Sequence, residues 1–155
     1  MSEQNATIEQ ILEQAIRFEE QAYDFYTAAV DMVKQPHIKD TLKDLAAEEV
    51  KHKEKLQALL EGNIESLIAV PQQKVQDLKL AEYLVVPPLA EDATFQDVLV
   101  VAMHREKSSH EFYSTVATIT DDESARTLLE FLAQEELVHK NKVETLYDEV
   151  VYQDN

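Results

Sequence analysis

The chain has 155 residues, with 31 acidic and 14 basic side chains, a net charge of −17, one glycine, four prolines and no cysteine. A surface this acidic repels phosphate backbones and anionic lipids, which argues against nucleic acids and membrane surfaces as partners. The lack of thiols excludes disulfides, cysteine catalysis and cysteine-ligated iron centres within these residues. Scarce glycine and proline with abundant Glu, Gln, Lys, Leu and Ala predict an all-α fold.

Two long helices are predicted in the first part of the chain. The first begins at the capping-box pattern Thr7-x-x-Gln10 and runs to about Val33. The second covers about 37–61 and ends at Gly62, the only glycine, which is placed to act as a C-terminal cap. The short turn between them predicts an antiparallel hairpin.

A second hairpin is predicted in the last third of the chain. Its first helix begins near Thr94 and ends near Thr118. Its second helix follows the pattern Thr120-x-x-Glu123 and reaches about Val150. The polar residues after Val150 are expected to fray.

A long connection, residues 63–93, joins the two hairpins. It is long enough to cross the length of a bundle, which favours ferritin-like order over a simple up-down bundle, and 73–83 has the pattern of a short fifth helix. We therefore expect a single domain, a ferritin-like four-helix bundle over 1–155. Its parts are a first hairpin (1–62), a crossover (63–93), a second hairpin (94–150) and a tail (151–155).

Targeting features are missing from the sequence. The first residues lack the basic start and apolar core of a signal peptide. The most apolar run, 83–90, is far shorter than the roughly 20 residues of a membrane span and contains two prolines. We expect a cytoplasmic protein.

Six polar residues recur in register. Glu49-x-x-His52 returns as Glu136-x-x-His139, and Glu19 returns as Glu106; each offset is 87 residues (136 − 49, 139 − 52 and 106 − 19). A Glu and a His three positions apart share one face of a helix. Four carboxylates and two imidazoles are the inventory that a two-metal carboxylate centre needs.

The position of these residues in the helical pattern makes the repeat informative. Residues spaced alternately by four and three positions form a seam that faces the neighbouring helices. On the predicted helices these seams are Ile8, Leu12, Ala15, Glu19, Ala22, Tyr26, Ala29 and Val33; Ile38, Leu42, Leu45, Glu49, His52, Leu56 and Leu59; Phe95, Leu99, Ala102, Glu106, Ser109, Tyr113 and Val116; and Ala125, Leu129, Leu132, Glu136, His139, Val143, Leu146 and Val150. Polar residues interrupt each apolar seam only near its middle.

Two interpretations of this interior polar layer remain. One is a buried polar network that fixes the register of the helices, with both imidazoles hydrogen-bonded to carboxylates. The other is a metal centre, in which two divalent cations cancel the four negative charges. The metal centre is favoured because charged side chains are rarely buried unless they are paired or bound to metal.

Other repeated residues have alternative roles. Tyr26 and Tyr113 either fill the core or act at the centre, where they would hydrogen-bond a ligand carboxylate or supply an electron or a proton to an oxygen intermediate. Glu48 and Glu135 either lie on a solvated face or guide cations inward. His110, one turn beyond Glu106, is either an accessory ligand or a residue at the rim.

The chain resembles the rubrerythrin-like branch of the ferritin-like superfamily. The resemblance rests on four segments that span nearly the whole chain outside the crossover, at 19–26 (EEQAYDFY), 45–53 (LAAEEVKHK), 106–113 (EKSSHEFY) and 132–140 (LAQEELVHK). It implies a centre of two iron ions, although manganese or mixed metals suit the same ligands. By position, Glu19 and Glu106 would be terminal ligands, Glu49 and Glu136 would bridge, and His52 and His139 would each cap one ion.

The resemblance also implies a function and shows two departures. Members usually append a rubredoxin domain, which a chain without cysteine lacks, so a separate electron donor such as a rubredoxin-like protein is expected. They also carry an additional Glu where this chain has Ser109. We expect an oxidoreductase that reduces hydrogen peroxide or dioxygen; the alternative is a non-catalytic iron-binding, storage or ferroxidase protein in a larger assembly. A homodimer or larger homo-oligomer is expected, for which Leu84, Val85, Val86 and Leu89 offer apolar surface.

Overall fold

The computed structural model describes the chain except residues 1–6, 63, 64, 66, 68, 87, 154 and 155. Four long helices form an all-α, ferritin-like bundle: α1 (Ile8–Val30), α2 (Pro36–Gly62), α5 (Phe95–Thr118) and α6 (Glu123–Gln153). Between α2 and α5 lie a short helix, α4 (Gln72–Asp77), and a 3-10 helix, η2 (Leu80–Leu84). No strand occurs in the part of the chain that is described.

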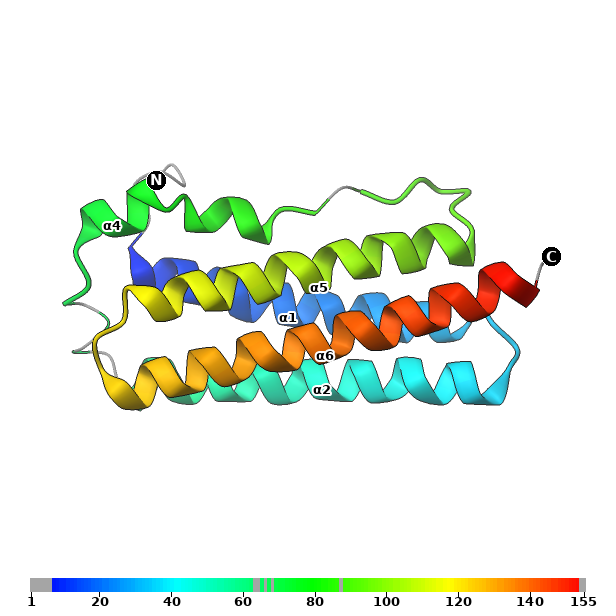
Figure 1. Cartoon of the computed structure of the whole chain (residues 1–155), viewed down its shortest axis with the longest axis horizontal. Coiled ribbons are helices and arrows are strands. Elements are labelled where there is room, and N and C mark those ends of the chain that lie inside the picture. The colour runs from blue at the N-terminus through cyan, green and yellow to red at the C-terminus, as the bar shows by residue number, and fades with distance from the viewer. Residues whose placement is uncertain (1–6, 63–64, 66, 68, 87, 154–155) are drawn as a thin grey trace.

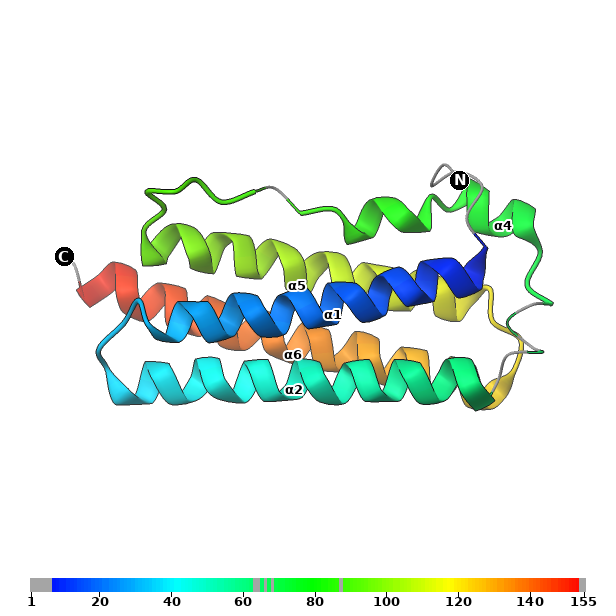
Figure 2. The same ribbon diagram turned by 180° about the vertical axis from the view of Figure 1, so that it is seen from behind.

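The helices pair as the sequence predicts. α1 packs against α2 and α5 packs against α6, and each pair is an antiparallel hairpin (Figures 1 and 2). The connection after α2 runs along the length of the bundle to the start of α5 (Figure 1), so the predicted crossover is confirmed. On the way, η2 packs against both α1 and α5. Among the described helices, none combines the length and hydropathy that a bilayer crossing requires.

Helix starts follow local capping chemistry, with one correction. Thr7 forms the expected capping box at α1, and Thr94 forms another with Asp97 at α5. The last helix follows Thr120-x-x-Glu123 as predicted and begins at Glu123, but the residue that caps it is Asp122 and not Thr120. The Oδ2 atom of Asp122 accepts the backbone N–H of Ala125 at 2.8 Å, whereas the Thr120 hydroxyl donates to the Val116 carbonyl at 2.7 Å. Thr120 therefore closes the preceding helix.

Helix ends differ more from expectation. Gly62 is the last residue of α2 but has no positive φ, so it does not form a left-handed cap. The last helix continues to Gln153 instead of fraying after Val150; residues 154 and 155 of the expected tail lie outside the described residues. The expected fifth helix is two short pieces, because Lys79 between them adopts a left-handed backbone with φ of 50°.

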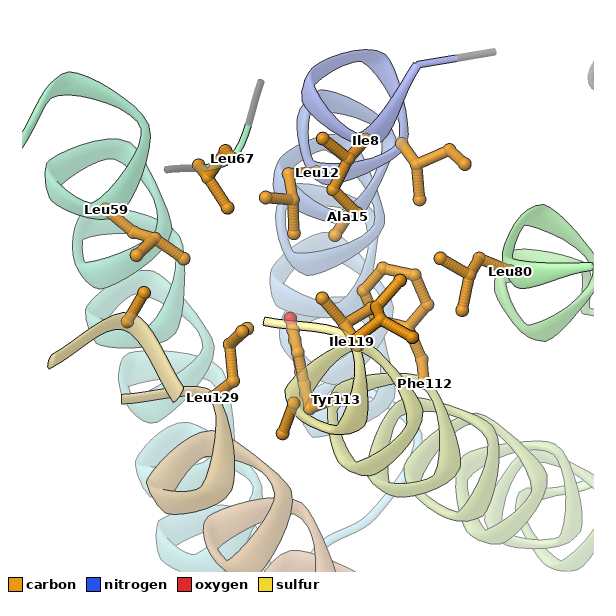
Figure 3. Packing of buried hydrophobic residues seen from close by; sticks show 14 of the residues in the cluster. Ile8, Leu12, Ala15, Leu59, Leu67, Leu80, Phe112, Tyr113, Ile119 and Leu129 are labelled. Carbon is orange, nitrogen blue, oxygen red and sulfur yellow. The ribbon is translucent and has the colours of Figure 1, made fainter. Parts of the chain in front are cut away.

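Two apolar clusters fill the interior, one toward each end of the bundle. The first includes the start of α1, the ends of α2 and α5 and the start of α6, and Leu80 of η2 adds to it (Figure 3). The second joins the opposite ends of the same four helices. All predicted seam residues are buried, except Val33, Phe95 and Val150, which are partly exposed. The polar residues of the seams lie between these two clusters.

Candidate metal centre

The structure brings together all six residues of the predicted ligand set. Each of the four long helices contributes, with Glu19 on α1, Glu49 and His52 on α2, Glu106 on α5, and Glu136 and His139 on α6. None of the six is more than 2% exposed. Each Glu-x-x-His pair reaches the interior because residues three apart on a helix lie on the same face. The helical register thus places four carboxylates and two imidazoles in one enclosed volume.

His52 faces three of the carboxylates through one ring atom. Its Nδ1 atom lies 2.6 Å from Oε1 of Glu136, 3.5 Å from Oε1 of Glu49 and 3.8 Å from Oε1 of Glu19. His139 repeats the arrangement from the opposite hairpin. Its Nδ1 atom lies 3.0 Å from Oε1 of Glu49, 3.7 Å from Oε2 of Glu106 and 3.7 Å from Oε1 of Glu136.

These distances define two overlapping groups of possible ligands. Both groups contain Glu49 and Glu136; one adds His52 with Glu19, and the other adds His139 with Glu106. The two imidazole rings stack with centroids 5.1 Å apart and an angle of 11° between their planes. Glu49, His52, Glu136 and His139 each offer a ligand atom within 4.8 Å of the others. Two adjacent metal positions that share a pair of carboxylates fit this geometry.

Buried like charges make the carboxylates poor anions in the metal-free protein. Burial, reinforced by the charges of Glu136 and Glu19, raises the pKa of Glu49 well above its ordinary value of 4.5. Burial first, and neighbouring carboxylates second, likewise raise the pKa values of Glu106 and Glu136. Divalent cations would relieve this repulsion, since two of them balance four carboxylates.

The imidazole of His139 is suited to the same task. Burial, together with the neighbouring ring of His52, lowers the pKa of His139 to about 4. The ring is therefore neutral at pH 7, and a neutral imidazole is the form that binds a metal.

Several buried ligand atoms make no well-aligned hydrogen bond, although the Nδ1 atoms of His52 and His139 lie within 3.0 Å of a carboxylate oxygen. They are Oε2 of Glu19, Oε1 of Glu49, Oε2 of Glu106, both carboxylate oxygens of Glu136, Nδ1 of His139 and both ring nitrogens of His52. Buried polar atoms are rarely left unpaired, because each unmade bond costs about 1–3 kcal/mol. A self-contained hydrogen-bond network, the alternative from the sequence, would have satisfied them. The donor set and its unpaired atoms fit a pair of bound metal ions.

Two tyrosines hydrogen-bond the carboxylates of Glu106 and Glu19 from the opposite hairpin. The Tyr26 hydroxyl donates to Oε1 of Glu106 at 2.6 Å, and the Tyr113 hydroxyl donates to Oε1 of Glu19 at 2.7 Å. Burial and the adjacent carboxylates raise the pKa values of both phenols well above 10.0, so both remain protonated donors. Each tyrosine fixes the carboxylate contributed by the other hairpin, which agrees with a role beyond filling the core.

One residue beside the centre escaped the sequence interpretation. Arg105 is 7% exposed, its guanidinium lies 4.3 Å from the centroid of the Phe18 ring, and it donates to the Phe18 carbonyl at 3.1 Å. Burial lowers its pKa, while the charges of nearby groups, including Glu49 and Glu106, oppose that shift. A buried cation therefore lies close enough to the carboxylates to interact with their charges. The residue 87 positions earlier in the repeat (105 − 18) is Phe18, which is buried. An arginine at the position that is apolar in the other half of the repeat was the signal in the sequence that could have identified Arg105.

The small and accessory residues are also placed. Ser109 and Ala22, each three residues after one of the clustered glutamates, are buried. His110 is not directed at the centre, because its Nδ1 atom lies 2.7 Å from the Ala133 carbonyl oxygen on α6. His37 is exposed and pairs with Glu149 at 2.6 Å.

The family model described as Rubrerythrin matches residues 10–147, which is most of the chain and includes all six clustered residues. Neither the curated proteins nor the solved structures that were compared include a significant match.

Proposed function

The chain belongs to the rubrerythrin family, and from this membership and its buried cluster we propose that it is a di-iron oxidoreductase that reduces hydrogen peroxide or dioxygen. The observation that carries the proposal is the presence of two overlapping carboxylate–imidazole groups with unpaired ligand atoms in a closed interior. Carboxylates and imidazoles are ligands that suit iron and also manganese.

Each ligand has an assigned role in this proposal. Glu49 and Glu136 approach both imidazoles and would be shared by the two metals. His52 with Glu19 would hold one metal, and His139 with Glu106 would hold the other. These assignments follow the distances of the two Nδ1 atoms from the carboxylates.

The protein's own side chains would prepare the reaction. Two bound iron ions would supply two electrons and Lewis acidity toward the oxygen substrate. Tyr26 and Tyr113 hold Glu106 and Glu19 in place and carry hydroxyl protons beside the centre. The apolar clusters above and below exclude bulk water, which strengthens every electrostatic interaction inside. Electrons would come from a separate donor, such as a rubredoxin-like protein.

A second candidate function is iron binding with ferroxidase activity in a larger assembly. Ser109 favours it, because the resemblance places an additional Glu at this position and a serine hydroxyl is a weaker ligand than a carboxylate. Assembly would use the apolar crossover, where Val85 is 59% and Leu89 is 40% exposed. Leu84 and Val86 are only half-buried there and contribute to the same surface. In either case we propose a cytoplasmic site of action.

Anaerobic loading with Fe(II), followed by separate pulses of peroxide and dioxygen, tests these proposals. Two iron ions per chain are expected in the unmodified protein and in Glu54→Gln, whose carboxyl is exposed on the same helix as Glu49. Glu49→Gln should fail to hold two. Repeated peroxide turnover with a chemical reductant supports the oxidoreductase. A single stoichiometric oxidation in a large assembly supports the second candidate, and no iron binding at all refutes both.

A further inference from the structure

A second cluster of possible ligands lies next to the first. Glu48 and Glu135 precede the two proposed bridging residues and are repeat mates (135 − 48 = 87). Each offers an oxygen that lies within 4.8 Å of a ring nitrogen of His52 and of the other carboxylate oxygen. Both side chains are half-buried, in contrast to the enclosed inner residues. They lie on α2 and α6, which are in contact, so this outer cluster lies between these helices on the way to solvent.

His52 connects the outer cluster to the inner centre. Its Nδ1 atom faces the inner carboxylates, at 2.6 Å from Glu136. Its Nε2 atom lies on the opposite side of the ring and has no hydrogen-bond partner, although the side chain is 0% exposed. An unpaired nitrogen in a wholly buried ring, beside two carboxylates, is unfavourable without an ion or a donor there. The contact at Nδ1 therefore leaves Nε2 for the outer pair.

We propose that Glu48, Glu135 and Nε2 of His52 form an outer site for a divalent cation, through which metal enters the inner centre. The inference rests on the proposed function, because it requires the inner centre to bind metal. Two carboxylates and one imidazole suit divalent ions such as Fe(II), Mn(II) and Co(II). Lys51, whose Nζ atom lies 3.2 Å from Glu48, is 61% exposed and is the cation that an arriving metal displaces.

The shared imidazole makes the outer site transient. A neutral imidazole has one lone pair, at Nδ1 or at Nε2 according to its tautomer, so an outer cation at Nε2 requires the ring proton on Nδ1. When the cation moves to Nδ1, one proton leaves that atom and one is gained at Nε2. The resulting Nε2–H then donates to Glu48 or Glu135 and orients the ring. One neutral imidazole cannot hold metal at both nitrogens, so the outer site empties as the inner one fills.

Loading with Co(II), followed by the absorption of the bound ion in a stopped-flow instrument, tests the proposal. In the unmodified protein the loading rate should saturate as Co(II) increases, because a pre-bound outer complex precedes inward transfer. The double variant Glu48→Gln/Glu135→Gln should load at least tenfold more slowly and lose this saturation, yet reach the same final two Co(II) per chain. The matched control is Glu54→Gln/Glu130→Gln, which removes two exposed charges from the same helices and should load within twofold of the unmodified protein.

The outcomes separate the two levels of the argument. A rate that rises linearly with Co(II) in the unmodified protein overturns the outer site without any variant. The outer site is also overturned if Glu48→Gln/Glu135→Gln loads as fast as the control variant. If that double variant loads at the normal rate but binds Co(II) more weakly, the two carboxylates only orient His52, and the outer site is again overturned. If the unmodified protein binds no Co(II) at the inner centre, the proposed function itself fails.

Discussion

Metal removal should invert the response of this protein to pH. After metal is stripped with a chelator, the inner carboxylates repel one another unless they take up protons. The pKa values of Glu49, Glu106 and Glu136 are raised above the ordinary 4.5 in the folded state, first by burial and then by neighbouring carboxylates. Their contribution to stability is therefore complete below about pH 4.5 and is lost as the pH rises through the folded-state values.

The size of the effect follows from the number of protons held. Each proton that the folded state holds in excess of the unfolded state changes the free energy of unfolding by about 1.4 kcal/mol per pH unit. His139 acts in the opposite direction, because its folded pKa of about 4 lies below the ordinary 6.5, so its contribution is lost as the pH falls through that interval. Below about pH 6.5, where the effect of His139 applies, three carboxyls against one imidazole leave at most two excess protons, or about 2.7 kcal/mol per pH unit. That corresponds to a rise in Tm of about 5–10 °C per unit of acidification.

Thermal unfolding followed by circular dichroism between pH 7 and pH 5 measures this. The Tm of the metal-free protein should rise on acidification, whereas the metal-loaded protein should lose stability as protons compete for its ligands. The Tm of the isosteric variant Glu49→Gln/Glu136→Gln should rise much less on acidification. All samples are measured in high salt, which screens the repulsion between surface charges. A metal-free Tm that is flat or falls from pH 7 to pH 5 would refute the reasoning.

Three further predictions concern residues around the centre. Tyr113→Phe leaves the buried carboxylate of Glu19 without its donor and should lower the free energy of unfolding by about 1–3 kcal/mol. The control Tyr23→Phe, on the exposed face, should change it by less than about 0.5 kcal/mol. Equal effects of the two substitutions in denaturant melts would contradict the bond between Tyr113 and Glu19. Arg105→Met keeps apolar bulk but removes the interior cation, so it should lower the Tm of the metal-free protein more than that of the metal-loaded protein; a larger loss with metal bound would show that Arg105 does not offset the carboxylates. Thr94→Ala removes the side-chain cap of α5 and should cost about 1 kcal/mol in denaturant melts, and no change would show that the cap contributes nothing.

The sequence carried enough information for the bundle and for the six clustered residues. Helical periodicity is a strong constraint, because a polar residue on an otherwise apolar seam has to lie in the interior. Glu106 on α5 and His139 on α6 each interrupt such a seam and are buried as predicted. The repeat then predicted that residues from both hairpins meet, since matching heights on two hairpins become neighbours once the hairpins pack.

The misplaced features depend on local competition that periodicity does not resolve. Thr120 and Asp122 are both capping residues, and the carboxylate caps α6 while the hydroxyl bonds the helix before it. Gly62 permits a left-handed backbone without requiring it. Arg105 was missed because a long charged side chain is assumed to be exposed, although a guanidinium can stack on an aromatic ring and bond a carbonyl in the interior. These outcomes depend on partners that are distant in sequence or on small differences in hydrogen bonding.

The shortest contacts of the centre all join one hairpin to the other. His52 approaches Glu136, and His139 approaches Glu49. Across the same interface, the two tyrosines bond Glu106 and Glu19. Neither hairpin alone can satisfy its own polar seam, because each tyrosine bonds a carboxylate of the other hairpin. The two bonded residues are 80 positions apart in one pair and 94 positions apart in the other. Docking of the hairpins and assembly of the centre are therefore one physical event. A metal bound between them would act as a cross-link on the fold, so the stability of the bundle and the occupancy of the centre should change together.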